Sequence, residues 1–434
     1  MAIGEKYRNQ LFRLFDLLRI NVGFYDLYSN ATHLLFLKYL ITYSDKLPDL
    51  SVESFKALIT FKRKYDNAKT GSEPLSSFDF RELFSKLDQD FVFSDMRLGD
   101  SFWTYDDIFR NKTSQKAILQ ALEDVEFESN QDFVGDFLEL LAQESMRDAK
   151  MTGESVTGKS LRELSAGLLS VTSDDVFLNC FSGYSSITLN IKDFKHYYGY
   201  ELNSKTFIVS KMLLVMRGMS NATVINDNFL TSDTKELANK AFSDGPLSMK
   251  YEDFPTLDYF GAKTKDGDLL ILYKVLDSLK QNGTAVIAVP GRTLFSESTS
   301  YRQMREIFTN NGLKAIISLP PLWVSTLVPT NLIVVQRGYE GKIVFINAST
   351  FGLKSKNKGN VVLSDDEIDK IVSTVSDFKE VDNFSAIVAR EEVLSKNDWV
   401  PNKYIKNVPK GQTNNLEDIN SELFDIYQEI KNSL

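Results

Sequence analysis

From about residue 158 onward, short apolar runs alternate with helical stretches, and this alternation constrains the fold more than any other feature of the chain. The runs, each short enough to be a buried strand, lie at residues 176–178, 196–200, 222–225, 241–242, 285–289, 315–319 and 332–336. Helical stretches precede and separate them at residues 161–169, 204–216, 269–279 and 300–309. Strands alternating with helices predict a parallel sheet that helices cover on both faces. We therefore expect an α/β, doubly wound, Rossmann-like sheet.

The chain before residue 150 has a different pattern. Leu11, Leu14, Phe15 and Leu18 recur at helical spacing, and strand-like alternation is rare in this part. A chain of 434 residues also exceeds one ordinary core, so two or three domains are expected. We expect a helical N-terminal domain over residues 1–150, the sheet over residues 151–360 and a C-terminal extension over residues 361–434.

The C-terminal tail carries a coiled-coil-like pattern. Its apolar residues are spaced by three, four, three and four positions, with charged residues between them: Leu416, Ile419, Leu423, Ile426 and Ile430. The pattern predicts a helix. This helix can pack on its own domain or bind a partner, and the spacing alone does not choose between the two.

The composition excludes several kinds of site. Two histidines and one cysteine, Cys180, are too few for a structural zinc site, and we expect no metal. His33 lies in an apolar helical stretch, where a packing role is favoured. The single cysteine excludes an internal disulfide and indicates a reducing, cytoplasmic location. No apolar run reaches the roughly 20 residues that cross a bilayer, so no membrane partner is expected.

The turn after the first expected strand is the first candidate binding site, because ligands of open parallel sheets bind beyond the carboxyl ends of the strands. This turn contains Asn179, Gly183 and Ser185. An acidic residue followed after three positions by Gly-x-Gly is the usual form, since glycine lets the backbone approach a ligand. Asn179 and Ser185 depart from that form. An ordinary turn and a cofactor-binding turn therefore both remain open.

Two further strand ends carry polar side chains. Glu201 ends the second expected strand, 22 residues after Asn179, where a carboxylate can accept both ribose hydroxyls of a nucleoside-type cofactor. Asn226, Asp227 and Asn228 end the third strand, where their side chains can reach an adenine edge. Each strand end also has a plain structural interpretation, Glu201 as a solvent-facing residue and the Asn-Asp-Asn segment as turn formers.

Taken together, these segments resemble the modification (methyltransferase) subunits of Type I restriction–modification systems, which methylate adenine N6 in DNA. The resemblance covers almost the whole chain, beginning with the helical segment 11–40. Its best matches are Gly-Tyr-Glu-Leu-Asn at residues 199–203 and the segments 276–290, 293–295, 316–320 and 328–333. It implies a Rossmann-like methyltransferase sheet, S-adenosylmethionine as cofactor, DNA as substrate and a multisubunit complex.

The resemblance also implies site residues. Thr157 lies in the segment 153–158, which is similar to a Gly-Glu-Phe-Tyr-Thr-Pro sequence of the family. The cofactor-binding set is then Thr157, Asn179, Gly183, Ser185, Glu201, Asp227 and Asn228. Residues 244–247 occupy the place of the family's catalytic tetrapeptide, in which Asn or Asp precedes two prolines and an aromatic. The expected catalytic residues are Asp244, Pro246 and Leu247, with Asp244 holding the adenine amine by positioning and electrostatics.

Partners follow from the same resemblance. In the family, a C-terminal helix packs against the sequence-reading specificity subunit, which favours a partner role for residues 416–434. A restriction subunit can join the same complex. The net charge is −9, whereas a protein that holds DNA alone usually presents a basic face. We therefore expect a partner subunit to supply much of the grip on DNA.

The departures from the family pattern are concentrated where chemistry is expected. The cofactor turn differs at two positions, Gly245 replaces a proline, and Leu247 replaces the aromatic that stacks on a flipped base. Tyr251 or Phe254 could stack in its place. Two hypotheses follow: an adenine-N6 methyltransferase of weakened activity, and a catalytically silent homologue that acts as a structural or DNA-binding subunit. A methyltransferase of RNA or protein is a third, less favoured one.

Overall fold

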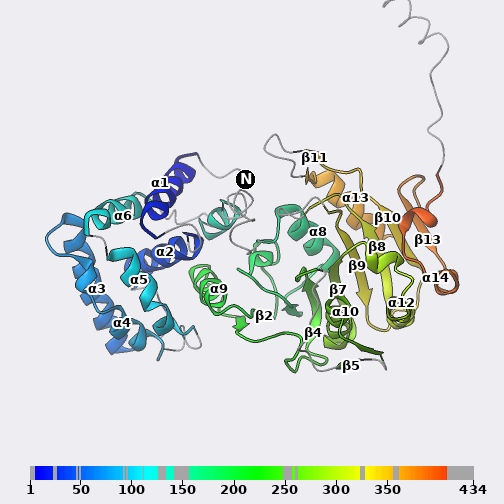
Figure 1. Ribbon diagram of the computed structural model, residues 1–434, viewed down its shortest axis with the longest axis horizontal. Helices are drawn as coiled ribbons and strands as arrows, with labels where there is room; N and C mark the ends of the chain where they lie inside the picture. The colour runs from blue at the N-terminus through cyan, green and yellow to red at the C-terminus, as the bar shows by residue number, and fades with distance from the viewer. Residues whose placement is uncertain are drawn as a thin grey trace, which may run out of the picture.

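The structure is a computed structural model of the chain (Figure 1). It describes residues 5–22, 27–44, 47, 50–90, 93, 96–110, 112–125, 133–140, 156–247, 257–259, 262–322, 328–354 and 361–407. Helices make up the N-terminal end of the molecule, and a sheet with helices on both faces makes up the rest (Figure 1).

The N-terminal part is helical, as predicted. Its helices are α1 (Glu5–Val22), α2 (Leu27–Tyr43), α3 (Val52–Thr70), α4 (Phe80–Leu87), α5 (Phe102–Phe109) and α6 (Lys112–Asp124), with 3-10 turns η1 (Leu75–Ser77) and η3 (Leu98–Ser101). Residues 133–140 are helical as well. The residues whose spacing predicted α1 are all fully buried: Leu11, Leu14, Phe15 and Leu18. Burial of such apolar stripes is what holds amphipathic helices together.

The second part is built on one nine-stranded sheet. In spatial order its strands are β13 (Ser385–Val388), β10 (Ile343–Asn347), β8 (Leu313–Ser318), β9 (Asn331–Gln336), β7 (Leu279–Val289), β4 (Ala238–Ser243), β1 (Val176–Asn179), β2 (His196–Tyr200) and β3 (Ala222–Ile225). Each of the seven apolar runs of the sequence contributes to a strand of this sheet, which confirms the predicted α/β fold. Two small hairpins lie outside it, β5 (Leu257–Tyr259) with β6 (Ala262–Thr264) and β11 (Leu353–Lys354) with β12 (Val361–Val362).

The sheet is mixed rather than wholly parallel. The strands from β3 through β2, β1 and β4 to β7 are parallel to their neighbours, as expected. β9 differs, because it lies antiparallel between β7 and β8. An antiparallel neighbour needs no helical crossover, and the described residues between β8 and β9 contain no helix. The apolar runs of β8 and β9 gave no sign of their relative direction.

Helices cover both faces of the sheet. One face carries α8 (Lys159–Leu169), α9 (Ser204–Met216) and α13 (Asp365–Ser376), and the other carries α10 (Gly267–Ser278), α12 (Thr299–Asn311) and α14 (Arg390–Lys396). Alternate strand residues face the two layers, so Phe177 belongs to one core and Leu178 to the other. The core beneath α8 and α9 is continuous with the core of the N-terminal helices.

The helix α9 joins the two parts of the molecule. Its apolar residues are spread around the helix instead of forming one stripe, and nine of its residues are buried, which is typical of a helix covered on more than one side. The sheet covers one side, and α2 packs against another. In Figure 1, α9 accordingly lies between the helical part and the strand β2.

Of the remaining sequence expectations, some agree with the structure and one falls outside the described residues. His33 is buried, bonds the Ser29 carbonyl oxygen through Nδ1 at 2.7 Å and packs edge-on against Tyr105, in agreement with a packing role. The segment expected to be a C-terminal extension, residues 361–434, also contributes β13 to the sheet. The helix expected at residues 416–434 lies outside the described residues. Among the residues that are described, no helix has the length and apolarity that a membrane span needs.

Candidate active site

Three polar strand ends meet at the centre of the sheet. From β1 the chain builds outward through β2 to β3 and then returns to β4 on the other side of β1. The carboxyl ends of β1, β2 and β4 are therefore adjacent, and they carry Asn179, Glu201 and Asp244. This reversal of strand order is where open α/β sheets bind ligands.

The turn after β1 keeps the backbone that the expected glycines would adopt. Gly183 has φ +50°, and Ser185 has φ +56° although it is not glycine, a conformation that L-residues adopt at a cost. Buried hydrogen bonds hold Ser185 in place: its hydroxyl accepts from the Tyr197 hydroxyl at 2.9 Å and bonds the Ser210 hydroxyl at 2.7 Å. The amide of Asn179 donates to the same Tyr197 oxygen at 3.2 Å. The two departures from the usual motif thus belong to one polar network.

Glu201 is held by the turn it faces. Its carboxylate accepts hydrogen bonds from the backbone N–H of Gly183 at 3.0 Å and of Asn203 at 2.7 Å. The absence of a side chain at Gly199 lets the turn after β1 lie close to β2, since a Cβ at position 199 would lie 2.8 Å from the Ser182 Cβ. A carboxylate can accept several hydrogen bonds, and a carboxylate held at this strand end is suited to the hydroxyls of a ribose.

Asp227 and Asn228 form a local turn. The Asp227 carboxylate accepts from the Asn228 N–H at 2.7 Å and from the Ser232 hydroxyl at 2.8 Å. The Asn228 side chain accepts from the Leu230 N–H at 3.0 Å. These bonds agree with turn formation, and the cofactor role of both residues stays a prediction.

The preceding residue, Asn226, was grouped with Asp227 and Asn228 as able to reach an adenine edge, and in the structure its side chain holds the end of β2. Its amide donates to the carbonyl oxygens of Glu201 at 2.8 Å and of Leu202 at 3.1 Å. It thereby fixes the backbone of the residue that carries the candidate ribose-binding carboxylate. Its place at a strand end was visible in the sequence, whereas its partners on a different strand were not.

Asp244 is bonded to the segment that precedes α8. The Thr157 hydroxyl donates to Asp244 Oδ2 at 2.5 Å. Behind Thr157 lies Arg162, whose side chain is completely buried. Its guanidinium donates to the Thr157 carbonyl oxygen at 2.5 Å and to Asn190 Oδ1 at 3.2 Å, and it forms an ion pair with Glu139. Thr157 and Asp244, assigned separately from the sequence, are thus in direct contact.

Burial dominates the ionisation of Asp244. It raises the pKa of this carboxyl from 3.8 to about 6, although the Thr157 hydroxyl and the nearby Arg162 charge act in the opposite direction. The carboxylate form therefore prevails at neutral pH, where it can accept a hydrogen bond from an amine.

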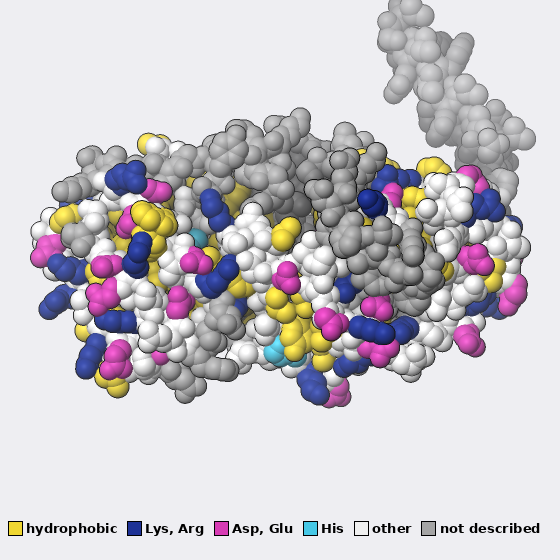
Figure 2. Space-filling model, turned by 60° about the horizontal axis from the view of Figure 1, so that its bottom comes forward, with side chains coloured by type: hydrophobic (Ala, Val, Ile, Leu, Met, Phe, Trp, Pro, Cys, Tyr) yellow, Lys and Arg dark blue, Asp and Glu magenta, His cyan; other side chains and the backbone are white. Residues whose placement is uncertain are grey.

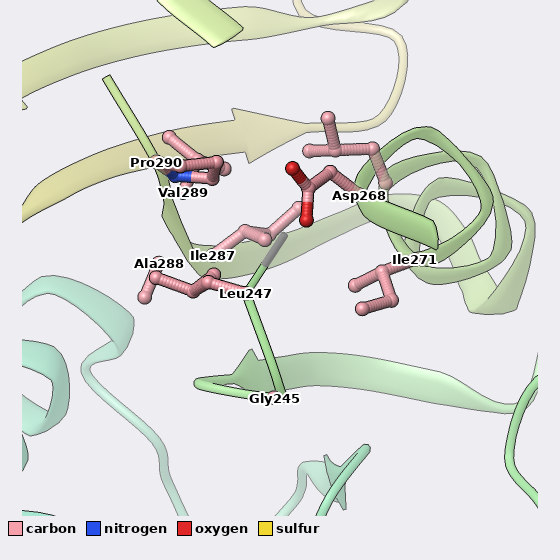
Figure 3. Close-up of a pocket in the computed structure, with 9 residues that line it drawn as sticks. Gly245, Leu247, Asp268, Ile271, Ile287, Ala288, Val289 and Pro290 are labelled. Carbon is pink, nitrogen blue, oxygen red and sulfur yellow. The ribbon is translucent and has the colours of Figure 1, made fainter. Parts of the chain in front are cut away.

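The rest of the tetrapeptide forms one side of a small pocket. Pro246 is exposed, whereas Gly245 is buried against Phe181: a Cβ at Gly245 would lie 2.4 Å from the Phe181 ring. Gly245 and Leu247 line a pocket with a volume of only about 10 Å³, which is room for about one water molecule. The other lining residues are Asp268, Ile271, Leu272, Ile287, Ala288, Val289 and Pro290. In Figure 3, the Asp268 carboxylate reaches into this largely apolar space from α10.

The residues around the turn fit a cofactor that combines a nucleoside with an amino-acid group. Near the ends of β1 and β4, three buried polar atoms have no hydrogen-bond partner among the described residues: Asn179 Oδ1, Ser182 Oγ and Ser243 Oγ. Buried polar atoms normally find partners, and the ammonium or hydroxyl groups of such a cofactor can supply them. The space beside Gly183 is open, because a Cβ there would meet nothing within 4 Å. By contrast, no group of three His, Cys, Asp or Glu residues among those described could hold a metal.

The fold and the strand-end residues define the class of the protein as a Rossmann-like methyltransferase. Residues 129–413 match the family model of the N-6 DNA methylases, and the chain belongs to this family. It is 25% identical to the Type I restriction enzyme MpnII methylase subunit of Mycoplasma pneumoniae, over 86% of this chain and 74% of that one. It is 23% identical to the MjaVIII methylase subunit of Methanocaldococcus jannaschii, over 70% of this chain and 58% of that one. The resemblance to Type I modification subunits is thereby confirmed.

Solved structures agree on the fold. The methyltransferase subunit of a type I restriction–modification system from Streptococcus thermophilus superposes with a TM-score of 0.74 at 20% identity, over 92% of this chain and 99% of that one. A modification subunit of a putative type I restriction enzyme from Vibrio vulnificus superposes with a TM-score of 0.64 at 14% identity, over 91% of this chain and 94% of that one.

The contact between Phe181 and Gly245 predicts that these two positions are coupled. Gly245→Ala should lower the free energy of unfolding by about 1–3 kcal/mol, because its Cβ overpacks the Phe181 ring. In a Phe181→Ala background the same change should cost less than about 0.5 kcal/mol, since the obstructing ring is gone. Urea unfolding of the four proteins measures the coupling. An equal cost in both backgrounds would contradict the contact.

The raised pKa of Asp244 predicts a pH-dependent effect of Asp244→Asn. The folded-state pKa of about 6 exceeds the ordinary value of 3.8, so the wild-type protein loses stability as the pH rises from about 4 through 6. Asparagine does not ionise and keeps an oxygen for the Thr157 hydroxyl. At roughly 1.4 kcal/mol per pKa unit, the stability of the variant relative to wild type should grow by about 2 kcal/mol between pH 4.5 and pH 8.

Denaturant unfolding at the two pH values tests this expectation. Asp193→Asn, a change at an exposed carboxylate before β2, serves as the control. A difference between Asp244→Asn and wild type that does not change with pH would show that Asp244 has an ordinary pKa.

Proposed function

We propose that this protein is the modification subunit of a Type I restriction–modification complex, with S-adenosylmethionine as cofactor and adenine N6 of DNA as methyl acceptor. The meeting of Asn179, Glu201 and Asp244 at adjacent strand ends is the observation that carries the proposal. Membership of the N-6 DNA methylase family and the similarity to Type I methylase subunits support it. A cytoplasmic location, where DNA is accessible, belongs to the same proposal.

The cofactor is proposed to lie over the turn after β1. Glu201 accepts the ribose hydroxyls through its carboxylate, which the backbone N–H groups of Gly183 and Asn203 hold in place. Asn179 Oδ1 accepts from the ammonium group, and Gly183 leaves room for the ligand beside the backbone. Ser185 shapes the turn through its left-handed backbone. Thr157, Asp227 and Asn228 complete the proposed cofactor-binding set.

Asp244 is proposed to hold the acceptor amine. The bound cofactor supplies an electrophilic methyl group on sulfonium. As a carboxylate at neutral pH, Asp244 accepts a hydrogen bond from the exocyclic amine and orients its nitrogen. Pro246 restricts the backbone of the loop, and Leu247 offers an apolar side chain to an extruded base.

Two features indicate that transfer is slow. Leu247 has no aromatic face on which a flipped base can stack. The Thr157 hydroxyl occupies one oxygen of Asp244, so the amine must share or displace that bond. The same bond, together with the Phe181 ring over Gly245, favours a second candidate function, a silent homologue that serves as a structural or DNA-binding subunit.

Partner subunits complete the proposal. A specificity subunit would bind the expected helix at residues 416–434, and a restriction subunit can join the complex. On the face in Figure 2, Lys and Arg side chains alternate with Asp and Glu side chains instead of forming one basic surface. Together with the net charge of −9, this mixture supports a grip on DNA that the partners share.

Titration of S-adenosylmethionine into the purified chain should give saturable heat. Glu201→Ala should weaken binding at least tenfold, because hydrogen bonds to a charged acceptor contribute roughly 1.5–3 kcal/mol each. Glu392→Ala, a change at an exposed glutamate of α14, should leave the affinity unaltered. An absence of binding at millimolar cofactor would refute the proposed cofactor site.

Methyl transfer is the second step to test. In the complex with a specificity subunit, the chain should incorporate labelled methyl groups into DNA at adenine N6, and Asp244→Ala should lower the rate about 100-fold or more. Cofactor binding without any incorporation would favour the silent homologue. Incorporation that is unchanged in Asp244→Ala would remove Asp244 from the mechanism.

A further inference from the structure

One arginine of the helical part reaches the edge of the candidate cofactor site. The Arg97 guanidinium donates from Nη2 to Asn226 Oδ1 at 2.6 Å, across 129 positions of sequence. The same guanidinium lies over the Phe207 ring of α9, 4.9 Å from its centroid. Arg97 therefore contacts both the end of β3 and the helix that follows β2.

The backbone conformation at Arg97 directs its side chain toward Asn226 and Phe207. Arg97 has φ +53° and ψ +44°, the left-handed conformation that non-glycine residues seldom adopt. The following turn holds it there: the Asp88 carboxylate accepts from the N–H of Leu98 at 2.7 Å and of Gly99 at 2.8 Å. Leu98 itself is fully buried. Uncommon backbone that its surroundings enforce in this way is often linked to function.

The receiving side chain leads directly to Glu201. While Asn226 Oδ1 accepts from Arg97, its amide nitrogen donates to the Glu201 carbonyl oxygen at 2.8 Å and to that of Leu202 at 3.1 Å. The Ser204 hydroxyl, at the start of α9, donates to Asn226 Oδ1 at 3.0 Å. A continuous hydrogen-bonded path thus runs from Arg97 through Asn226 to the backbone of Glu201.

We propose that Arg97 is a positioning residue that couples the placement of the helical part to the affinity for the cofactor. This inference rests on the proposed function, because it assumes that Glu201 carries the cofactor ribose. With the bridge in place, the β2 end is held and the Glu201 carboxylate is preorganised. When the helical part shifts on the sheet, the bridge opens and that preorganisation is lost. Coupling between two sites is reciprocal, so a bound cofactor must in turn stabilise the bridge and the turn around residues 98–101.

Binding measurements and hydrogen exchange test the bridge together. Arg97→Ala should raise the Kd for S-adenosylmethionine about fivefold, the lower end of typical coupling. In methylation assays the KM for the cofactor should rise with little change in kcat, because Arg97 does not reach the reacting atoms. Without cofactor, the amides of residues 201–205 should exchange faster in the variant. Cofactor should slow exchange at residues 98–101 in wild type and not in Arg97→Ala.

Two further variants separate the bridge from a general loss of stability. Arg81→Ala removes another arginine of the helical part, one that lies 4.1 Å from the centroid of the Phe102 ring, and it should leave the Kd and the exchange at 201–205 unchanged. In an Asn226→Ala background, Arg97→Ala should have no additional effect on the Kd, since the path is already broken.

The outcomes distinguish this inference from the proposed function. Wild-type binding with an Arg97→Ala Kd within twofold of wild type, and unaltered exchange, would overturn the coupling and leave the cofactor site standing. An equal loss of affinity in Arg81→Ala would overturn the bridge in favour of a general effect. No cofactor binding by wild type would overturn the proposed function, and the coupling with it.

Discussion

The candidate site depends on a charge that has no access to water. Arg162 is completely buried, and such a charge is tolerated only when it is paired and hydrogen-bonded. Its partners come from three separate segments: Glu139 of the helical part, the Thr157 carbonyl, and Asn190 after the cofactor turn. The hydroxyl of Thr157 in turn donates a hydrogen bond to Asp244 and holds its carboxylate in place. The guanidinium therefore fixes the position of the candidate catalytic carboxylate relative to both the helices and the turn after β1.

The residues that depart from the family motifs are held in place by specific contacts with their neighbours. Ser185 retains a glycine-like backbone because Tyr197 and Ser210 bind its hydroxyl, and Asn179 joins the same network. Gly245 leaves space that the Phe181 ring fills. The cofactor turn and the tetrapeptide are thus adapted to each other. Compared with the family motif one position at a time, these residues indicate a degenerate site, whereas their contacts describe a well-packed alternative.

The sequence predicted what depends on local pattern. Short apolar runs located the strands, and helical spacing located the N-terminal helices. Position at a strand end singled out Glu201, and the family resemblance singled out Asp244. The direction of β9 was missed, since an apolar run has no polarity that shows which way it pairs. Arg97, Arg162 and the role of Asn226 in holding the end of β2 were missed for a related reason. Their importance lies in partners 5 to 129 residues away in the chain, and no spacing rule encodes such distances.

The helix α9 has a consequence for how the molecule can be divided. Nine residues of α9 are buried between the sheet and α2. Separating the two parts of the molecule would therefore expose a large apolar surface to water. The stability of each part therefore depends on the other, and a destabilising substitution in one part should lower the free energy of unfolding of both. A single cooperative body of this kind resists division, by evolution or by a protease, into a separate helical module and a separate methylase module.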